Sequence, residues 1–187
     1  MPGILFYVVG PSGSGKDTLI DGAKASLAAT GAFVFARRVI TRPADSPGEA
    51  HEATDEADFA RRRDAGEFLL AWKAHGLRYG LPRDLLEALE AGRHVVANGS
   101  RAVAADLARR VPHLVILEVW APPETLQARI AARGREAGQA VAERLARRTP
   151  DLPADIPVIR VANDGAPAEG VQRFVTALRE AAASAGR

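Results

Sequence analysis

The sequence predicts an α/β protein in which helices cover both faces of a parallel central sheet. Residues 4–9 form an unbroken apolar run that ends at a glycine-rich segment, as expected of a strand buried on both faces. Farther along the chain, strand-like and helix-like segments alternate, which is typical of parallel sheets with crossover helices. The length of 187 residues, 47% of them hydrophobic and 26% charged, fits one globular domain with a sizeable core.

The individual elements follow from apolar patterning and from glycine and proline signals. The helix expected from residue 16 stops before Gly31, and another expected helix has Pro82 at its start and Gly92 just past its end. Residues 42–50 are expected to form a loop, and residues 75–82 a turn-rich link. The expected strands are residues 4–9, 33–41, 68–72, 94–97, 114–120 and 158–161. The expected helices are residues 16–29, 55–63, 82–91, 101–111, 122–133, 141–148 and 167–183.

Composition excludes several classes of function. Without cysteine there is no disulfide framework, no thiolate metal site and no cysteine nucleophile. The net charge of +2 is too small to indicate nucleic-acid binding, and an aromatic content of 5% offers no stacking pattern for RNA or DNA. The apolar N-terminus lacks a basic region, and no apolar run is long enough to span a bilayer. We therefore expect a cytoplasmic protein that binds neither nucleic acid nor membrane.

The segment "GPSGSGKDT" predicts a phosphate-binding loop. It follows a buried strand and opens a helix, so its glycines allow backbone N–H groups and the helix N-terminus to surround a phosphate. Lys16 supplies a positive charge for the β- and γ-phosphates. The predicted nucleotide-binding residues are Gly10, Pro11, Ser12, Gly13, Ser14, Gly15, Lys16, Asp17 and Thr18.

Asp17 stands where such loops usually carry a serine or threonine whose hydroxyl binds Mg²⁺. Three interpretations are open. Asp17 could be a helix-start acid stabilised by the helix dipole by about 0.3–1 kcal/mol. It could instead be a Mg²⁺ ligand, directly or through water, or Thr18 could supply the hydroxyl with a shifted geometry. A carboxylate beside a triphosphate is repulsive without a cation between them, which favours the metal role.

Five segments resemble the guanylate-kinase-like branch of the P-loop kinases over nearly the whole chain. They are "GPSGSGK", "VITRPADSPGE", "FLLAWKAHGLRYG", "IAARGRE" with "AERLARR", and "VAND". The resemblance implies a three-layer P-loop kinase fold in a single domain, with an acceptor-binding insertion and a small arginine-rich lid. The core would comprise residues 1–41, 92–132 and 150–187, the insertion 42–91, and the lid 133–149.

The departures from that branch point to a different acceptor. Guanylate kinases read the base with acids, whereas the matching positions here hold Leu70, Val96 and Asn98. Arginines are plentiful, which suggests a small acceptor with several phosphates and no base. The segments "GPSGSGKDT", "HGLRYG", "NGSR", "RGRE" and "NDG" resemble the ribose 1,5-bisphosphate phosphokinases of phosphonate catabolism. Guanylate kinase and a non-catalytic guanylate-kinase-like interaction module remain the alternatives.

This resemblance implies an enzyme that uses ATP and Mg²⁺ to convert ribose 1,5-bisphosphate into 5-phosphoribosyl 1-diphosphate and ADP. We expect the 5-phosphate to accept the phosphoryl group and Arg101 to hold the 1-phosphate. The implied catalytic residues are Lys16, Asp17, Arg133 and Arg144, and Arg133 and Asn163 join the loop in binding ATP. The implied substrate residues are Arg38, Arg42, Tyr79, Asn98, Arg101, Arg135 and Arg148. Asp17 is the implied Mg²⁺ ligand, in place of an acid at the end of the third core strand, where Asn98 stands.

Overall fold

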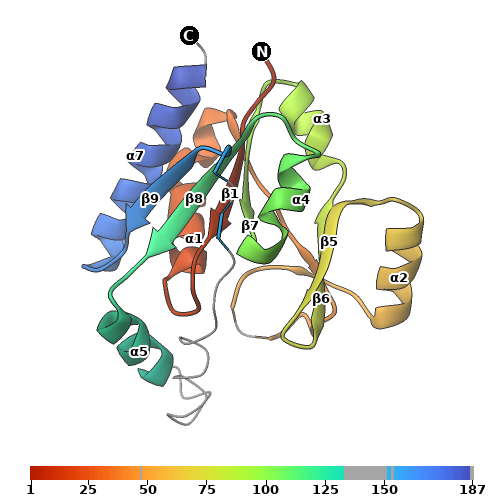
Figure 1. The fold of residues 1–187 in the computed structure, drawn as a ribbon, viewed down its shortest axis with the longest axis horizontal. Coiled ribbons are helices and arrows are strands. Elements are labelled where there is room, and N and C mark those ends of the chain that lie inside the picture. The colour runs from red at the N-terminus through yellow and green to blue at the C-terminus, as the bar shows by residue number, and fades with distance from the viewer. Residues whose placement is uncertain (47, 133–150, 153, 186–187) are drawn as a thin grey trace.

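The computed structural model has the predicted α/β fold, with a parallel central sheet between two layers of helices (Figure 1). The structure describes residues 1–46, 48–132, 151–152 and 154–185. In the described part of the chain, no helix is both long and apolar enough to cross a membrane.

The central sheet has the strand order β2-β7-β1-β8-β9, and every neighbouring pair is parallel. β1 (Leu5–Val9) lies in the middle and is fully buried, as its unbroken apolar run predicts. Because all the strands run the same way, their carboxyl ends meet at one edge, where β1 leads into the glycine loop. The other strands are β2 (Phe33–Phe35), β7 (His94–Asn98), β8 (Leu114–Trp120) and β9 (Val158–Ala162).

Alternate residues of β1 supply two separate hydrophobic cores. Phe6 and Val8 pack against α1 (Lys16–Leu27) and α7 (Pro167–Ala185), whose ribbons lie together on one side of the sheet in Figure 1. Leu5, Tyr7 and Val9 pack on the opposite face, against α3 (Leu85–Glu90) and α4 (Ala104–Ala108). The period of two along a strand therefore distributes one apolar run between both layers.

A second, smaller sheet stands beside the core and carries α2 (Glu56–Asp64) on its outer side (Figure 1). Its strand order is β4-β3-β6-β5, and β5 and β6 form an antiparallel hairpin. The Asp55 carboxylate caps α2 by accepting from the Asp58 N–H at 2.7 Å. The strands are β3 (Val39–Ile40), β4 (Glu52–Ala53), β5 (Phe68–Ala74) and β6 (Leu77–Pro82).

Three predicted boundaries are wrong in this region. Residues 33–41 form two strands in different sheets, because the chain leaves the core between Phe35 and Val39 to enter the small sheet. Residues 75–82 are mostly strand β6, and only His75 and Gly76 make the turn, with φ of 51° and 76°. Such a two-residue turn with positive φ is a hairpin turn, but histidine is an unusual residue for it. Pro82 ends β6 instead of opening a helix, so α3 starts later than predicted.

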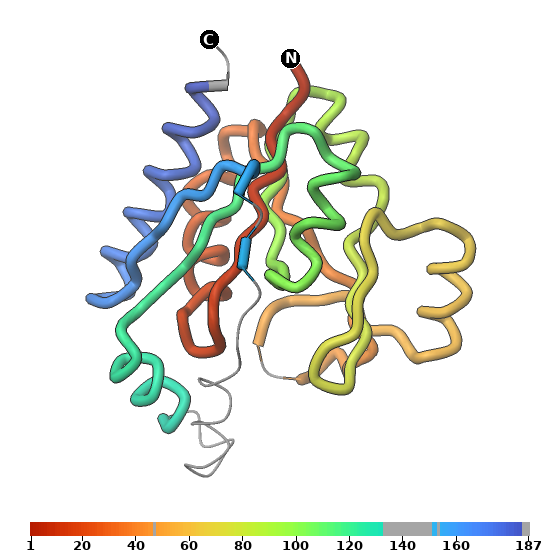
Figure 2. The backbone as a smooth tube through the Cα atoms, in the orientation of Figure 1, coloured from red at the N-terminus to blue at the C-terminus, as the bar shows by residue number. Residues whose placement is uncertain are grey.

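The remaining elements lie close to their predicted places. The segment from Arg101 begins with 3₁₀-helix η2 (Arg101–Val103) before α4, and 3₁₀-helix η1 (Ala28–Thr30) follows α1. α5 (Pro123–Ala132) lies beyond the end of β8, while both chain ends lie at the opposite end of the molecule (Figure 2). The helix expected at residues 141–148 lies outside the described residues.

We predict that Gly99→Ala destabilises the fold. A methyl group there would lie 1.9 Å from the ring of Tyr7, which is fully buried and hydrogen-bonded at its hydroxyl, so the ring has no room to move. Overpacking of this kind costs about 1–3 kcal/mol, measurable by urea unfolding. Gly165→Ala is the control, because its methyl group would meet only the flexible Glu169 carboxylate. Equal stability of the two variants would contradict the prediction.

We also predict that acid weakens the fold through His94. Its Nδ1 accepts from the Ile4 N–H at 3.1 Å, its ring packs beside Phe6 and Phe33, and burial lowers its pKa from 6.5. A lowered pKa means that the folded state resists protonation, so stability is present above about pH 6.5 and is lost as pH falls through the folded pKa. The unfolding free energy of the wild type should therefore drop more between pH 7.5 and 5 than that of His94→Gln. Parallel pH profiles would refute the assignment.

Candidate active site

The glycine loop connects β1 to α1 and has the backbone conformation that its sequence requires. Gly10 and Gly15 have φ of 154° and 88°, and a methyl group on them would meet the Val119 carbonyl at 2.2 Å and Asn163 Nδ2 at 2.3 Å. Lys16 opens α1, and its Nζ donates to the carbonyls of Gly10 and Pro11 at 2.8 and 3.1 Å. The loop therefore holds its lysine and the helix N-terminus at the edge where the core strands end.

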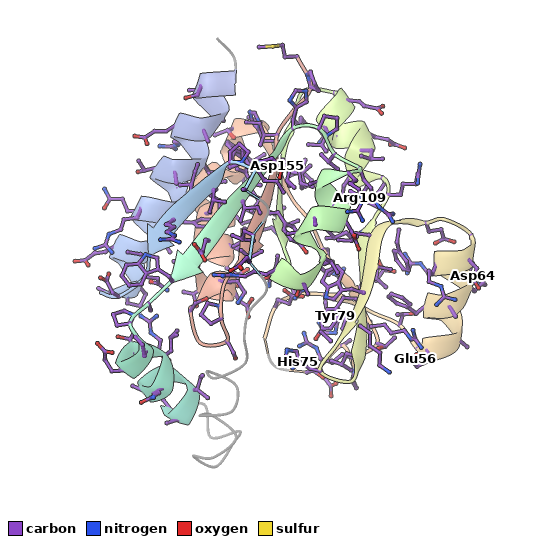
Figure 3. All side chains as sticks on the ribbon, viewed as in Figure 1. Glu56, Asp64, His75, Tyr79, Arg109 and Asp155 are labelled. Carbon is purple, nitrogen blue, oxygen red and sulfur yellow. The ribbon has the colours of Figure 1, made fainter. Side chains whose placement is uncertain are left out.

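A cavity of about 330 Å³ lies between this loop and the small sheet. Figure 3 shows Tyr79 on the side of the β5–β6 hairpin that faces the central sheet, and His75 at the hairpin tip. Of the described candidate residues, the cavity lining includes Gly10, Pro11, Ser12, Gly13, Gly15, Lys16, Asp17, Arg38, Tyr79, Asn98 and Arg101. The cavity is thus lined by phosphate-loop residues and cationic side chains from different parts of the sequence.

A chain of hydrogen bonds runs from the small-sheet side of this cavity to the loop. Arg38 donates through Nε to Glu49 Oε1 at 2.7 Å, and this ion pair is largely shielded, with side-chain exposures of 12% and 14%. Asn98 Nδ2 donates to Glu49 Oε2 at 2.5 Å and to Asp17 Oδ1 at 3.0 Å. Asn98 itself is 8% exposed, and its Oδ1 has no partner among the described residues. Glu49 and Asp17 are therefore bridged by one amide.

Arg42 lies in the loop that carries Glu49 and does not line the cavity, unlike Arg38. Its Nη2 lies 3.0 Å from His51 Nδ1 and 3.4 Å from the Glu49 carbonyl. His51 is buried, and its Nε2 lies 3.1 Å from the Arg42 carbonyl. These contacts hold the loop in its folded conformation, and His51 stabilises that conformation.

Arg101 lines the cavity and is paired on its other side with an acid inside the core. Its Nη2 donates to Glu118 of β8, which is 6% exposed and also accepts from Arg160 Nε at 2.8 Å. Beneath the same corner, the Tyr7 hydroxyl accepts from the Ser100 N–H at 2.8 Å, and burial raises the pKa of Tyr7 to about 12. Tyr7 therefore stays protonated and anchors the backbone beside Arg101.

A second cavity, of about 310 Å³, opens on the other side of the loop. It is lined by Gly13, Gly15, Thr18, Arg129, Ala132, Asn163 and Pro167. Asn163 is 4% exposed and donates from Nδ2 to the Ser14 carbonyl at 2.7 Å, while Arg129 donates to the Asn163 carbonyl at 2.8 Å. Ser14 is fully buried and lines neither of these two cavities. Asp17 and Thr18 thus face different cavities.

Sequence reasoning missed four residues that the structure brings to the site or its edge: Glu49, Trp72, Glu118 and Arg129. Glu49 lies in the quoted segment "VITRPADSPGE", and Glu118 is a lone acid in the apolar run "LVILEVW", so both carried a usable signal. No sequence signal marked Arg129 or placed Trp72 at the cavity, because both placements depend on tertiary packing. Leu70 is 2% exposed in the hydrophobic core and does not line the cavity. Arg133, Arg135, Arg144 and Arg148 lie outside the described residues.

The arrangement can hold phosphates and a hard cation. Asp17 is the one acid among the described residues that line the first cavity, next to Lys16. The described residues contain no cluster of three or more histidine, cysteine or acidic side chains suited to a metal ion. Mg²⁺ in kinases is usually held by one or two carboxylates together with substrate phosphates, a requirement that this donor set meets.

Comparison with solved structures supports the fold. The chain matches the guanylate kinase from Anaplasma phagocytophilum with a TM-score of 0.68 and 19% identity, over 96% of this chain and 86% of that one. It matches a gluconokinase from Sinorhizobium meliloti 1021 with a TM-score of 0.55 and 18% identity, over 98% and 95% of the chains. No family model matches the sequence.

Comparison with curated proteins finds relatives of two lengths. Bifunctional ribose 1,5-bisphosphokinase-thymidine phosphorylases from Cupriavidus necator and Azorhizobium caulinodans are 58% and 56% identical over 95% and 94% of this chain. The chain spans only 29% and 25% of their lengths.

The relatives of similar length are named for one activity only. Ribose 1,5-bisphosphate phosphokinase PhnN from Methylobacterium radiotolerans is 45% identical, over 96% of this chain and 99% of that protein. Its counterpart from Agrobacterium fabrum is 39% identical, over 96% and 98%. By sequence along its whole length and by its guanylate-kinase-like fold, this chain belongs to the ribose 1,5-bisphosphate phosphokinase family.

Proposed function

We propose that this chain transfers the γ-phosphoryl group of ATP to ribose 1,5-bisphosphate, producing 5-phosphoribosyl 1-diphosphate and ADP. One observation carries the proposal: a single cavity joins the phosphate-binding loop to Arg38, Tyr79, Asn98 and Arg101. Two anionic substrates can bind side by side only where cations or hydrogen-bond donors contact each of their phosphates, and this cavity supplies both kinds of group. The relatives named for this activity support the same assignment.

The donor nucleotide would lie across the loop. Its triphosphate would be held by the loop N–H groups and Lys16, with Gly13 and Gly15 bordering both cavities. Its adenosine would lie in the second cavity, beside Arg129 and Asn163. The buried Oδ1 of Asn163 has no partner among the described residues and is free to accept from an amino group.

The acceptor would lie in the first cavity, held by cations and a hydroxyl. The product carries its diphosphate on carbon 1, so atom balance requires the 1-phosphate to accept the phosphoryl group, not the 5-phosphate as the sequence reasoning had it. We therefore assign the 1-phosphate to Arg38 and Tyr79, and the 5-phosphate to Arg101. Arg42 would act through its loop, because its side chain contacts His51 and the Glu49 carbonyl.

The chemical step needs positioning more than acid–base catalysis. The bond between the γ-phosphorus and its bridging oxygen breaks, and ADP leaves with the electron pair. A bond forms from that phosphorus to an oxygen of the 1-phosphate, which is already ionised and needs no general base. Lys16 and Arg38 would offset the charge that gathers between the two substrates. Arg133, Arg135, Arg144 and Arg148 are proposed on the resemblance alone to close over the transferring group.

Asp17 is the residue that would hold Mg²⁺, because its carboxylate lines the cavity next to Lys16 while Thr18 lines the other one. When bound, the ion supplies positive charge that neutralises the β- and γ-phosphates. Asn98 would keep the Asp17 carboxylate in place through the 3.0 Å hydrogen bond. In the sequence, an acid stands on the loop, at Asp17, and an amide at the strand end, at Asn98. The hydrogen bond between them gives the amide a role beside the acid.

The direct test measures ADP release by the purified protein with ATP and Mg²⁺. We expect turnover with ribose 1,5-bisphosphate and formation of 5-phosphoribosyl 1-diphosphate, and at most a small fraction of that rate with GMP. The products are identified by phosphorus NMR, where the new diphosphate on carbon 1 gives its own signals. Turnover with GMP alone would make the chain a guanylate kinase, and no turnover with either would favour a binding module.

We predict that Asp17→Asn raises the Mg²⁺ concentration needed for half-maximal ADP release by about 10-fold or more, since loss of a metal-holding group has effects of this size. Asp21→Asn is the matched control, an exposed acid one turn farther along the same helix. An unchanged Mg²⁺ dependence of Asp17→Asn would show that this acid only stabilises the helix start.

A further inference from the structure

An aromatic pair closes the small-sheet end of the first cavity. Trp72 of β5 and Tyr79 of β6 lie opposite each other in the hairpin, and their rings are stacked 5.4 Å apart at 11°. The Arg38 guanidinium lies over both rings, 4.9 Å from the Tyr79 centroid and 5.7 Å from that of Trp72. All three side chains line the cavity, so this cation-covered stack forms one of its walls.

The wall is held from behind and is not free to move aside. Trp72 is 9% exposed and belongs to the same hydrophobic core as Leu70 and Leu81. The ion pair with Glu49 at 2.6 Å also holds Arg38 over the rings. Rotating the indole out of the wall would therefore break both packing and the cation–π contact.

This wall leaves a nucleobase neither room nor partners. The two rings stack on each other and the Arg38 guanidinium lies over both, so the chain's own groups already occupy much of the aromatic surface on which a base could stack. Among the described residues, the acid that lines the cavity is Asp17 at the phosphate loop, and Glu49 is already paired with Arg38. A base at the Trp72 end would therefore find no unpaired carboxylate for its N–H groups. Sites that leave such donors unpaired discriminate strongly against the ligand.

We propose that Trp72 is the specificity-determining residue that restricts the acceptor to a sugar phosphate without a base. This inference rests on the proposed function and adds the means by which nucleoside monophosphates are rejected. The indole occupies apolar volume at this wall of the cavity that would otherwise be open to a base on the acceptor. Removing it leaves an apolar space beside Tyr79, and apolar cavities of this kind accept small aromatic ligands.

The main test compares Trp72→Ala with Trp120→Ala. The chain has two tryptophans, and Trp120 is 41% exposed and lines neither cavity, so it is the matched control. Binding of AMP, GMP, CMP and UMP is measured by calorimetry, and kcat/KM by ADP release. We expect the preference for ribose 1,5-bisphosphate over the best nucleoside monophosphate to fall about 10-fold or more in Trp72→Ala only. Equal preferences in the wild type and Trp72→Ala would overturn the proposal.

Two further measurements keep the test decisive if Trp72→Ala folds poorly. Trp72→Phe and Trp72→Leu fill most of the space and should give smaller losses of preference, in order of the volume removed. In Trp120→Phe, Trp72 is the sole tryptophan, and its fluorescence should change as ribose 1,5-bisphosphate is added. A variant that turns over this substrate with no fluorescence change would show that Trp72 does not border the acceptor.

The outcomes also separate this proposal from the proposed function. If the wild type releases no ADP with ribose 1,5-bisphosphate, the proposed function fails. Calorimetry of Trp72→Ala with nucleoside monophosphates then still tests the wall, and a gain of binding supports it. If the wild type is active and the variants keep its selectivity, the wall alone is refuted.

Discussion

The site depends on one hydrogen-bonded chain that links Arg38, Glu49, Asn98 and Asp17. It ties the small sheet to the phosphate loop through side chains, although the two are far apart in sequence. Glu49 is paired with the Arg38 cation, and the Asp17 carboxylate accepts from the neutral Asn98 amide, so donors hold both acids in place. Asn98 donates to both acids, which offsets part of the repulsion between Glu49 and Asp17 at the edge of the proposed substrate site.

The parallel sheet makes this chain possible by bringing strand ends together. Asn98 ends β7, and β7 pairs with β1, so its amide lies beside the start of the glycine loop. Glu118 lies opposite Val9 in the neighbouring pair and holds Arg101 from the other side. Asn98 pairs with Val8 and Glu118 with Val9, so the buried amide and the buried acid stand at successive levels on the two strands that flank β1. Asn98 orients Asp17 and Glu118 orients Arg101, in both cases through a direct hydrogen bond that a residue on a rigid strand makes.

In the proposed function, the central sheet and its loop bind phosphates, and the small sheet selects the acceptor. Its hairpin turn at His75 and Gly76 sets the register that puts Trp72 opposite Tyr79. That register lets two aromatic rings stack under an arginine whose other side is paired with Glu49. A one-residue slip of either strand would turn its ring to the opposite face of the sheet and break the stack.

The sequence by itself determined the fold class, the phosphate loop and most core elements, because these depend on local patterns. The apolar run before Gly10, the glycines with Lys16, and the alternation of strands and helices are all readable within short windows. Only the tertiary structure decided that residues 33–41 divide between two sheets and that Arg38, not Arg42, lines the cavity. It also decided that Glu49 meets Asn98 and that Trp72 forms a wall instead of plain core. The contacts of these residues join segments that are distant in the sequence. Strand pairing and side-chain packing bring such segments together in three dimensions, and a local sequence pattern holds no information on that.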